Sequence, residues 1–203
     1  MVSVARNPGY LMSFSTGGLL INESVELARL HREGEAWDLT LARAMQDGLA
    51  SLPKAASNRR TLREIRNRIA CLSAAEREFL TDLADRQEQH ALLWVAACRA
   101  YRFVREFAVE VLGERYLSWR LDLGQQAFEV QFAAKAEWDE GLAAISPSTR
   151  RKLGQVLYRM MREAGLLSAD GRIQTVYLSP RLKSLIVEGD PDGLEVFPGG
   201  DTG

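Results

Sequence analysis

The stretch Ala91-Leu-Leu-Trp-Val-Ala-Ala-Cys98 carries no charge and lies between His90 and Arg99. A helix that is apolar on nearly all sides is normally buried among other helices. The pattern therefore predicts a central buried helix from Gln89 to Leu112, ended by Gly113. A membrane-spanning helix needs about 20 apolar residues, so we expect no transmembrane segment. The first residues also lack the pattern of a signal peptide.

Capping signals and apolar spacing predict further helices around this one. Ser73 and Glu76 match a capping box, and Ser146-Pro147 matches an N-cap followed by proline. Asp170-Gly171 lies between apolar runs, which predicts a small β-hairpin. We therefore expect an all-α compact bundle with one C-terminal hairpin. The predicted helices cover residues 24–32, 37–49, 58–72, 73–83, 116–144, 147–165 and 180–186, with Leu117, Leu121, Phe128 and Phe132 in the core.

The charge is unevenly distributed along the chain. The 203 residues have a formal net charge of −1, and 46% are hydrophobic and 26% charged, as in ordinary globular proteins. Residues 50–72 nevertheless contain six cations and one acid, and residues 146–187 contain eight cations and two acids. We expect an N-terminal bundle over 1–145, a basic C-terminal segment over 146–187 and an acidic disordered tail over 188–203.

The first basic block has a helical face of its own. Apolar residues recur at Leu62, Ile65, Ile69 and Leu72, which makes one buried stripe. The opposite side carries Arg60, Arg63 and Asn67, with Arg59 beside them, whereas Arg66 flanks the apolar side; Lys54 precedes this helix. The helix is therefore expected to bury one side and present arginines on the other.

The second basic block repeats this arrangement. We expect the buried stripe to contain Leu153, Val156, Leu157, Met160, Met161 and Ala164. The opposite arc carries Arg151, Lys152, Gln155, Tyr158, Arg159 and Arg162, with Glu163 at its edge. Cations suit phosphates, and amides and guanidinium groups suit base edges. Arg172, at the predicted hairpin, would add a contact resembling that of a wing.

A solvated helix face usually alternates charge and forms ion pairs along the helix. The two basic faces have one acid each, Glu64 and Glu163, so a polyanion or an acidic protein surface fits them better. Nucleic acid would make about six phosphate contacts and bind with strong salt dependence. The candidate DNA-binding residues are Lys54, Arg59, Arg60, Arg63, Asn67, Arg151, Lys152, Gln155, Arg159, Arg162 and Arg172.

Catalytic and metal-binding signatures are missing from the sequence. The histidines are His31, which we expect to be solvated, and His90, which we expect to be half-buried and bonded to backbone. Cys71 and Cys98 are expected to be buried reduced thiols, typical of a cytoplasmic protein. We predict no catalytic residue, metal, cofactor or small-molecule substrate. Glu76, Glu78, Asp82 and Asp85 are expected to form a solvated acidic face, and Gly17-Gly18 a turn.

Four segments share their pattern with a known family. They are Tyr10-x-x-Ser13-Phe14-Ser15-Thr16-Gly17-Gly18-Leu19-Leu20-x-x-Glu23-Ser24; Arg60-x-x-Arg63-Glu64-Ile65-x-x-Arg68-Ile69; Leu93-Trp94-Val-Ala-Ala-Cys98-x-x-Tyr101-x-Phe103-Val-x-Glu106-Phe107; and Ser148-Thr149-x-x-Lys152-Leu153-x-Gln155-Val156-Leu157 through Arg162-Glu163-Ala164-Gly165-Leu166-Leu167. Together, over residues 10 to about 186, they resemble the BrxA family of BREX phage-exclusion systems.

This resemblance implies a small helical accessory protein of bacterial phage defence. It implies a bundle similar to the RNA-binding factor NusB, and binding of double-stranded DNA without catalysis. Two alternatives remain open. The basic faces could dock an acidic partner among other BREX proteins, or they could bind RNA by analogy with the bundle fold.

Overall fold

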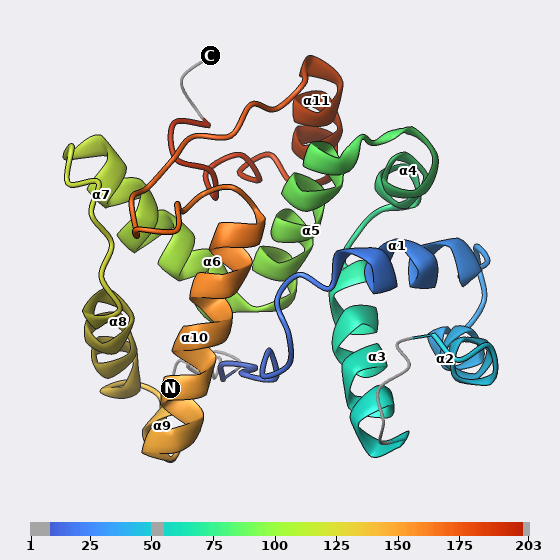
Figure 1. Ribbon diagram of the computed structural model, residues 1–203, viewed down its shortest axis with the longest axis horizontal. Coiled ribbons are helices and arrows are strands. Elements are labelled where there is room, and N and C mark those ends of the chain that lie inside the picture. Colours follow the sequence, from blue (N-terminus) through green and yellow to red (C-terminus); the bar gives the residue numbers. More distant parts are fainter. Residues whose placement is uncertain (1–8, 50–54, 201–203) are drawn as a thin grey trace, which may run out of the picture.

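The fold is built around one buried helix, as the uncharged stretch predicts. The structure is a computed structural model that describes residues 9–49 and 55–200. Helix α5 (Arg86–Ala100) lies at the centre, and every residue from Ala91 to Cys98 is buried. Helices α1 (Ile21–Leu30), α3 (Ala55–Ile69), α10 (Pro147–Glu163) and α11 (Pro180–Gly189) pack around it (Figure 1).

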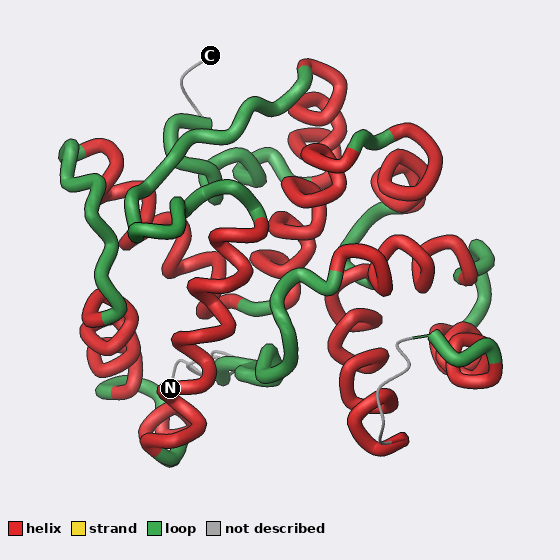
Figure 2. Tube along the Cα trace, in the orientation of Figure 1, coloured by secondary structure: helices red, strands yellow, loops and turns green. Residues whose placement is uncertain are grey.

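Shorter helices complete the bundle, and loops join them without a strand in the described part of the chain (Figure 2). None of these helices combines the length and apolar character that crossing a bilayer requires. Among the residues proposed for the core, Phe128 and Phe132 are buried, but Leu117 is 70% exposed. The remaining helices are α2 (Trp37–Gln46), α4 (Ala74–Glu78), η1 (Phe79–Leu83), α6 (Arg102–Glu106), η2 (Phe107–Gly113), α7 (Glu114–Leu117), α8 (Gln126–Ala136) and α9 (Glu140–Ala143).

The central helix is shorter than the apolar pattern suggests. It ends at Tyr101, whose backbone is extended at φ −127° and ψ 100°, before α6 begins in a new direction. The buried Tyr101 ring packs against Phe14, with the Arg68 guanidinium 5.6 Å from the ring centroid. Neither Gly nor Pro marks this break, because tertiary packing produces it. Gly113 has helical dihedrals and does not end the helical run.

The predicted hairpin is reduced to isolated antiparallel bridges. Leu167 pairs with Ile173, and Arg172 pairs with Asp122 in the loop that follows α7. Asp170-Gly171 does form the turn, with Gly171 at φ 85°. The apolar residues on either side are used for packing against the bundle, so no longer ladder forms.

The prediction of a disordered acidic tail is wrong for residues 188–200. Val196 and Phe197 are buried, and the Trp94 indole N–H donates to the Val196 carbonyl at 3.0 Å. Arg105 pairs with Asp190 at 2.8 Å. One of the acids that suggested disorder, Asp190, thus has cationic partners inside the fold. The hydrophobic core also continues across residue 145, so the segments 1–145 and 146–187 share it.

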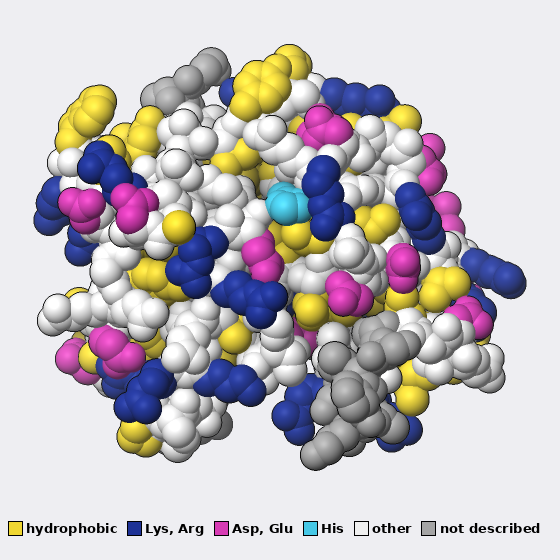
Figure 3. Space-filling model, viewed as in Figure 1, with side chains coloured by type: hydrophobic (Ala, Val, Ile, Leu, Met, Phe, Trp, Pro, Cys, Tyr) yellow, Lys and Arg dark blue, Asp and Glu magenta, His cyan; other side chains and the backbone are white. Residues whose placement is uncertain are grey.

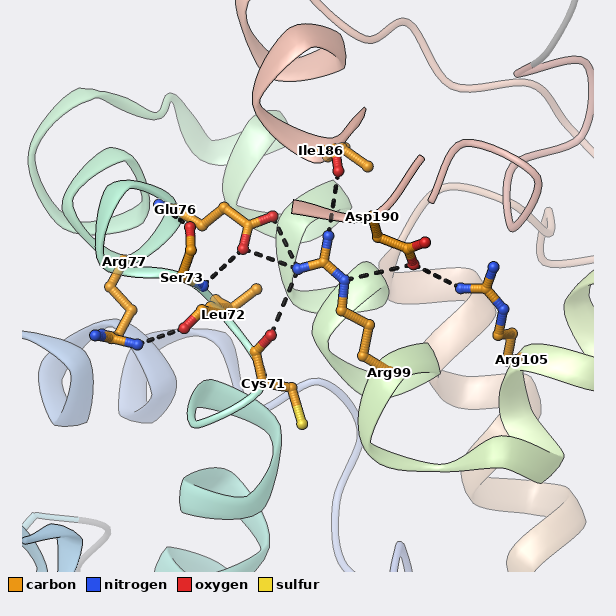
Figure 4. A network of polar contacts seen from close by, with 9 residues as sticks. All are labelled: Cys71, Leu72, Ser73, Glu76, Arg77, Arg99, Arg105, Ile186 and Asp190. Carbon is orange, nitrogen blue, oxygen red and sulfur yellow. Dashed lines mark hydrogen bonds and ion pairs between the residues drawn. The ribbon is translucent and has the colours of Figure 1, made fainter. Parts of the chain in front are cut away.

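The expected acidic face is also wrong at Glu76. Its side chain is fully buried, and it completes the capping box with Ser73 at the start of α4. Both Glu76 carboxylate oxygens accept from the Arg99 guanidinium at 2.8 Å, and Asp190 lies between Arg99 and Arg105 (Figure 4). Glu76 is buried because Arg99, in the central helix α5, lies beside the start of α4 and pairs with the Glu76 carboxylate.

Replacing Glu76 should therefore destabilise the fold. Glu76→Ala leaves the Arg99 guanidinium with only the more distant Asp190 carboxylate, at 3.7 Å. The loss of one partner of a buried pair costs about 3 kcal/mol. Glu78, exposed on the same helix, provides the matched control, and Glu78→Ala should change stability by less than about 0.5 kcal/mol. Urea unfolding of both variants measures the difference; equal midpoints would contradict the structural role of Glu76.

The packed tail makes a second prediction. Phe197→Ala should lower the free energy of unfolding by roughly 3 kcal/mol, because a buried phenylalanine is replaced by a cavity. Equilibrium denaturation gives this value directly. If the variant is as stable as the unaltered protein, Phe197 does not contribute to the core, and the expectation of a disordered tail would stand.

Candidate nucleic-acid interface

Helix α3 buries and exposes the sides that its sequence predicts. Leu62, Ile65 and Ile69 are buried in the core. On the other side, the guanidinium groups of three exposed residues form no hydrogen bond or ion pair with any described residue. These are Arg59, Arg60 and Arg63, and Asn67 lies half-buried beside them. Lys54 lies outside the described residues.

The one acid of α3 faces inward. Glu64 is 3% exposed and forms a buried ion pair with Arg68 one turn later. Burial raises the pKa of Glu64, and the Arg68 charge and hydrogen bonds from Thr16 oppose that rise. Glu64 therefore neutralises Arg68 inside the protein and leaves the outer arginines without an acid.

Helix α10 shows the same division. Its predicted apolar stripe is buried throughout. Arg151, Lys152, Gln155 and Arg162 are exposed, and their side chains have no hydrogen-bond or ion-pair partner in the described part of the chain. Arg159 differs, because it is 60% exposed yet pairs with Glu163 at 2.8 Å.

Tyr158 does not belong to the exposed arc in which its spacing places it. The side chain is 2% exposed, and its hydroxyl donates to the Gly124 carbonyl at 2.6 Å. Burial raises the Tyr158 pKa to about 12, so the hydroxyl stays protonated as a donor. The loop after α7 thus lies against this side of α10, a contact that no local pattern reveals.

One turn of the N-terminal segment connects both basic helices. On the α3 side, Thr16 donates through N–H and hydroxyl to Glu64, and Arg68 donates to the Gly18 carbonyl at 2.7 Å. On the α10 side, the Leu19 N–H donates to the Glu163 carboxylate at 2.5 Å. Figure 1 shows this segment running between α3 and α10.

Gly18 is required for this connection. A Cβ at Gly18 would lie 2.1 Å from a Glu163 carboxylate oxygen, so a side chain would displace the carboxylate. The expected turn at Gly17-Gly18 is present, with Gly17 at φ 63°. The turn residues seat a carboxylate of the protein itself, which fixes the position of α10.

Basic side chains are visible over both helices in a single view of the molecule. In the view of Figure 3, Lys and Arg side chains lie over α10 and near the lower end of α3, and they also lie elsewhere on this face with Asp and Glu among them. The exposed Arg172 side chain at the 168–171 turn also has no ion pair among the described residues. The predicted cations of α3 and α10 that the structure describes are thus exposed, each on the outer side of its own helix.

The histidines and cysteines have structural surroundings. His90 is half-buried with Nδ1 2.5 Å from the Glu163 carbonyl, as predicted. His31 is not solvated, because its ring stacks on Trp37 at 3.7 Å and bonds Thr40. Burial raises the pKa of the Cys98 thiol. Among the described residues, no group of His, Cys, Asp and Glu could hold a metal ion.

Comparisons with known proteins give a family and a structural relative. No curated protein matches. The fold is similar to the crystal structure of an uncharacterized protein from Magnetospirillum magneticum, with a TM-score of 0.76 and 21% identity. That likeness covers 92% of this chain and 96% of the other. A model of the BrxA family matches residues 8–190. The chain therefore belongs to the BrxA family, which implies a role associated with BREX phage defence.

Proposed function

We propose that this protein is a non-enzymatic double-stranded DNA-binding component of a BREX system. It contacts mainly the phosphate backbone through the outer faces of α3 and α10. We further propose that it acts in the cytoplasm by binding alone, possessing no catalytic residue or cofactor of its own. The likeness of its bundle to NusB stays a prediction.

The observation that supports this proposal is where the unpaired cations lie. Elsewhere in the fold, Arg43, Arg99 and Arg105 each have a carboxylate partner. Arg32, Arg120 and Arg181 lack one among the described residues, but they are single cations on different elements, whereas α3 and α10 each carry several along one helix face. On the outer faces of α3 and α10, the exposed cations other than Arg159 have none within the described residues. Neighbouring like charges repel, and a bound polyanion relieves that repulsion while releasing its own counterions.

Duplex DNA suits the arrangement because the two helices are held at fixed separation. The Thr16–Leu19 turn bonds acids of both helices, so their cations move as one surface. Phosphates of a duplex are also spaced rigidly, and a matching rigid surface loses little conformational freedom on binding. Gln155 and Asn67 place amides among the cations, which suits hydrogen bonding to base edges.

Charge reversal on α10 should weaken DNA binding. Arg151→Glu with Arg162→Glu removes two phosphate contacts, and we expect affinity to fall on the order of tenfold or more. The slope of log K against log salt should become shallower by about 2. Fluorescence anisotropy with a labelled duplex, titrated at several salt concentrations, gives both quantities.

A matched pair controls for net charge. Arg32→Glu with Arg181→Glu changes the total by the same amount at exposed positions outside the two faces. This control should bind nearly as tightly as the unaltered protein. If both double variants lose the same affinity for DNA, the loss reflects overall charge and not the α10 face. If the affinity of the unaltered protein does not change with salt concentration, the proposed phosphate contacts are refuted.

The α3 face makes an independent prediction. Arg60→Glu with Arg63→Glu should produce a loss comparable to the α10 pair, because both helices contact one duplex. Combining the two pairs should abolish measurable binding at moderate salt. If the α3 pair has no effect, the interface is confined to α10.

Competition distinguishes the alternative partners. Unlabelled duplex DNA should displace the probe more effectively than RNA of equal length and sequence; the reverse order would favour the RNA alternative. Other BREX proteins retained after DNase treatment, and lost on the same charge reversals, would favour docking to an acidic partner.

A further inference from the structure

Trp119 occupies a backbone conformation that normally belongs to glycine. Helix α7 ends in a Schellman motif, in which the Arg120 N–H donates to the Arg115 carbonyl at 2.9 Å and the Trp119 N–H to the Tyr116 carbonyl at 3.0 Å. The residue after the C-cap is left-handed in this motif, and here Trp119 has φ 57°. A bulky side chain is strained there, because its Cβ crowds the backbone.

Burial does not compensate for this strain. The Trp119 side chain is 86% exposed. The other left-handed non-glycine residue of the described chain, Leu20 at φ 54°, instead packs against the core. A strained residue retained without packing is a reason to look for a functional role.

The loop that carries Trp119 is held in place by backbone hydrogen bonds. The loop after α7 pairs with the 168–171 turn, since the Ile173 N–H donates to the Leu121 carbonyl and the Leu123 N–H to the Gly171 carbonyl, each at 2.8 Å. Just after this turn, the Gln174 N–H donates to the carbonyl of Leu166, in the segment that follows α10, at 2.9 Å. The indole therefore projects from a fixed position.

The loop that carries Trp119 contacts α10 next to its basic face. Tyr158 holds the loop through the Gly124 carbonyl. On a helix, residues three and four positions apart are neighbours, so the exposed Gln155 and Arg162 lie one turn before and one turn after the buried Tyr158. The loop that carries Trp119 thus borders the proposed DNA-binding stripe.

The loop after α7 and the 168–171 turn carry almost no net charge together. Arg120 and Arg172 are exposed and lack an ion-pair partner in the described chain, but Asp122 and Asp170 lie on the same segments. Charge is therefore not the main feature they offer. Their distinctive group is the flat, exposed indole ring of Trp119, which Arg120 follows in the chain, while Arg172 is bridged to Asp122 of the same loop.

We propose that Trp119 is a second nucleic-acid contact, whose indole stacks on a base while Arg120 and Arg172 hold the flanking phosphates. This inference rests on the proposed DNA-binding function and extends it beyond phosphate contacts. Aromatic side chains stack on any base, because every base has a π-face, and inserted side chains can partly unstack a duplex step.

Trp119→Gly tests the proposal without endangering the fold, because glycine adopts this conformation freely. The thermal midpoint should stay equal or rise. Affinity for a labelled duplex should fall by about tenfold, the scale of losing one base–aromatic contact. Trp119→Phe should recover most of that loss. Trp138→Gly, which removes another exposed tryptophan at 89% exposure, should leave affinity unchanged.

Tryptophan fluorescence supplies a direct readout. DNA should quench the emission of the unaltered protein and of Trp138→Phe, but much less that of Trp119→Phe, because stacking brings the indole against a base. A duplex containing a mismatch should bind more tightly than a matched one in the unaltered protein, and this preference should disappear in Trp119→Gly.

The outcomes separate this inference from the function on which it rests. If the unaltered protein binds no nucleic acid, the proposed function fails and this inference with it. If the unaltered protein binds DNA with the expected salt dependence and Trp119→Gly binds equally well, only the stacking role is overturned. Loss of a BREX protein partner in Trp119→Gly, with DNA affinity intact, would assign the ring to protein docking and would also overturn it.

Discussion

The hydrogen bonds between the Thr16–Leu19 turn and two carboxylates hold the proposed surface together. Glu64 of α3 and Glu163 of α10 both bond this turn, and Arg68 closes the connection to the Gly18 carbonyl. The contact is close enough that Gly18 cannot carry a Cβ without meeting Glu163. These bonds, together with the packing of both helices against α5, therefore hold the two basic helices in place.

The same bonds explain how a protein of almost zero net charge can present a positive surface. Each basic helix has one acid, and both acids bond the Thr16–Leu19 turn rather than standing free among the outer cations. Glu64 neutralises the buried Arg68, and Glu163 neutralises Arg159 alone. Arg150 of α10 pairs with Glu129. The outer cations Arg59, Arg60, Arg63, Arg151, Lys152 and Arg162 have no internal counter-charge within the described residues, so an external polyanion can provide it.

The outward and inward sides of α3 and α10 could be predicted because helical periodicity is local. Leu62 and Leu153 are buried, and Arg63 and Arg151 are exposed, as their spacing requires. Tyr158, Glu76 and Phe197 were beyond such reasoning. Each is buried by a partner distant in sequence, respectively Gly124, Arg99 and the core around α5. A polar or tail residue is buried when tertiary packing supplies such a partner, and one sequence does not record that pairing.

Local chemistry alone was enough to specify the central apolar helix, the capped starts of α4 and α10, and two faces rich in arginine. These features depend on residues within a turn or two of one another, where geometry follows from the helix itself. The break at Tyr101, the packed C-terminal segment and the strained Trp119 depend on contacts between distant segments. The folding of the chain as a whole fixed those contacts, because their energy comes from surfaces that meet after the helices have assembled.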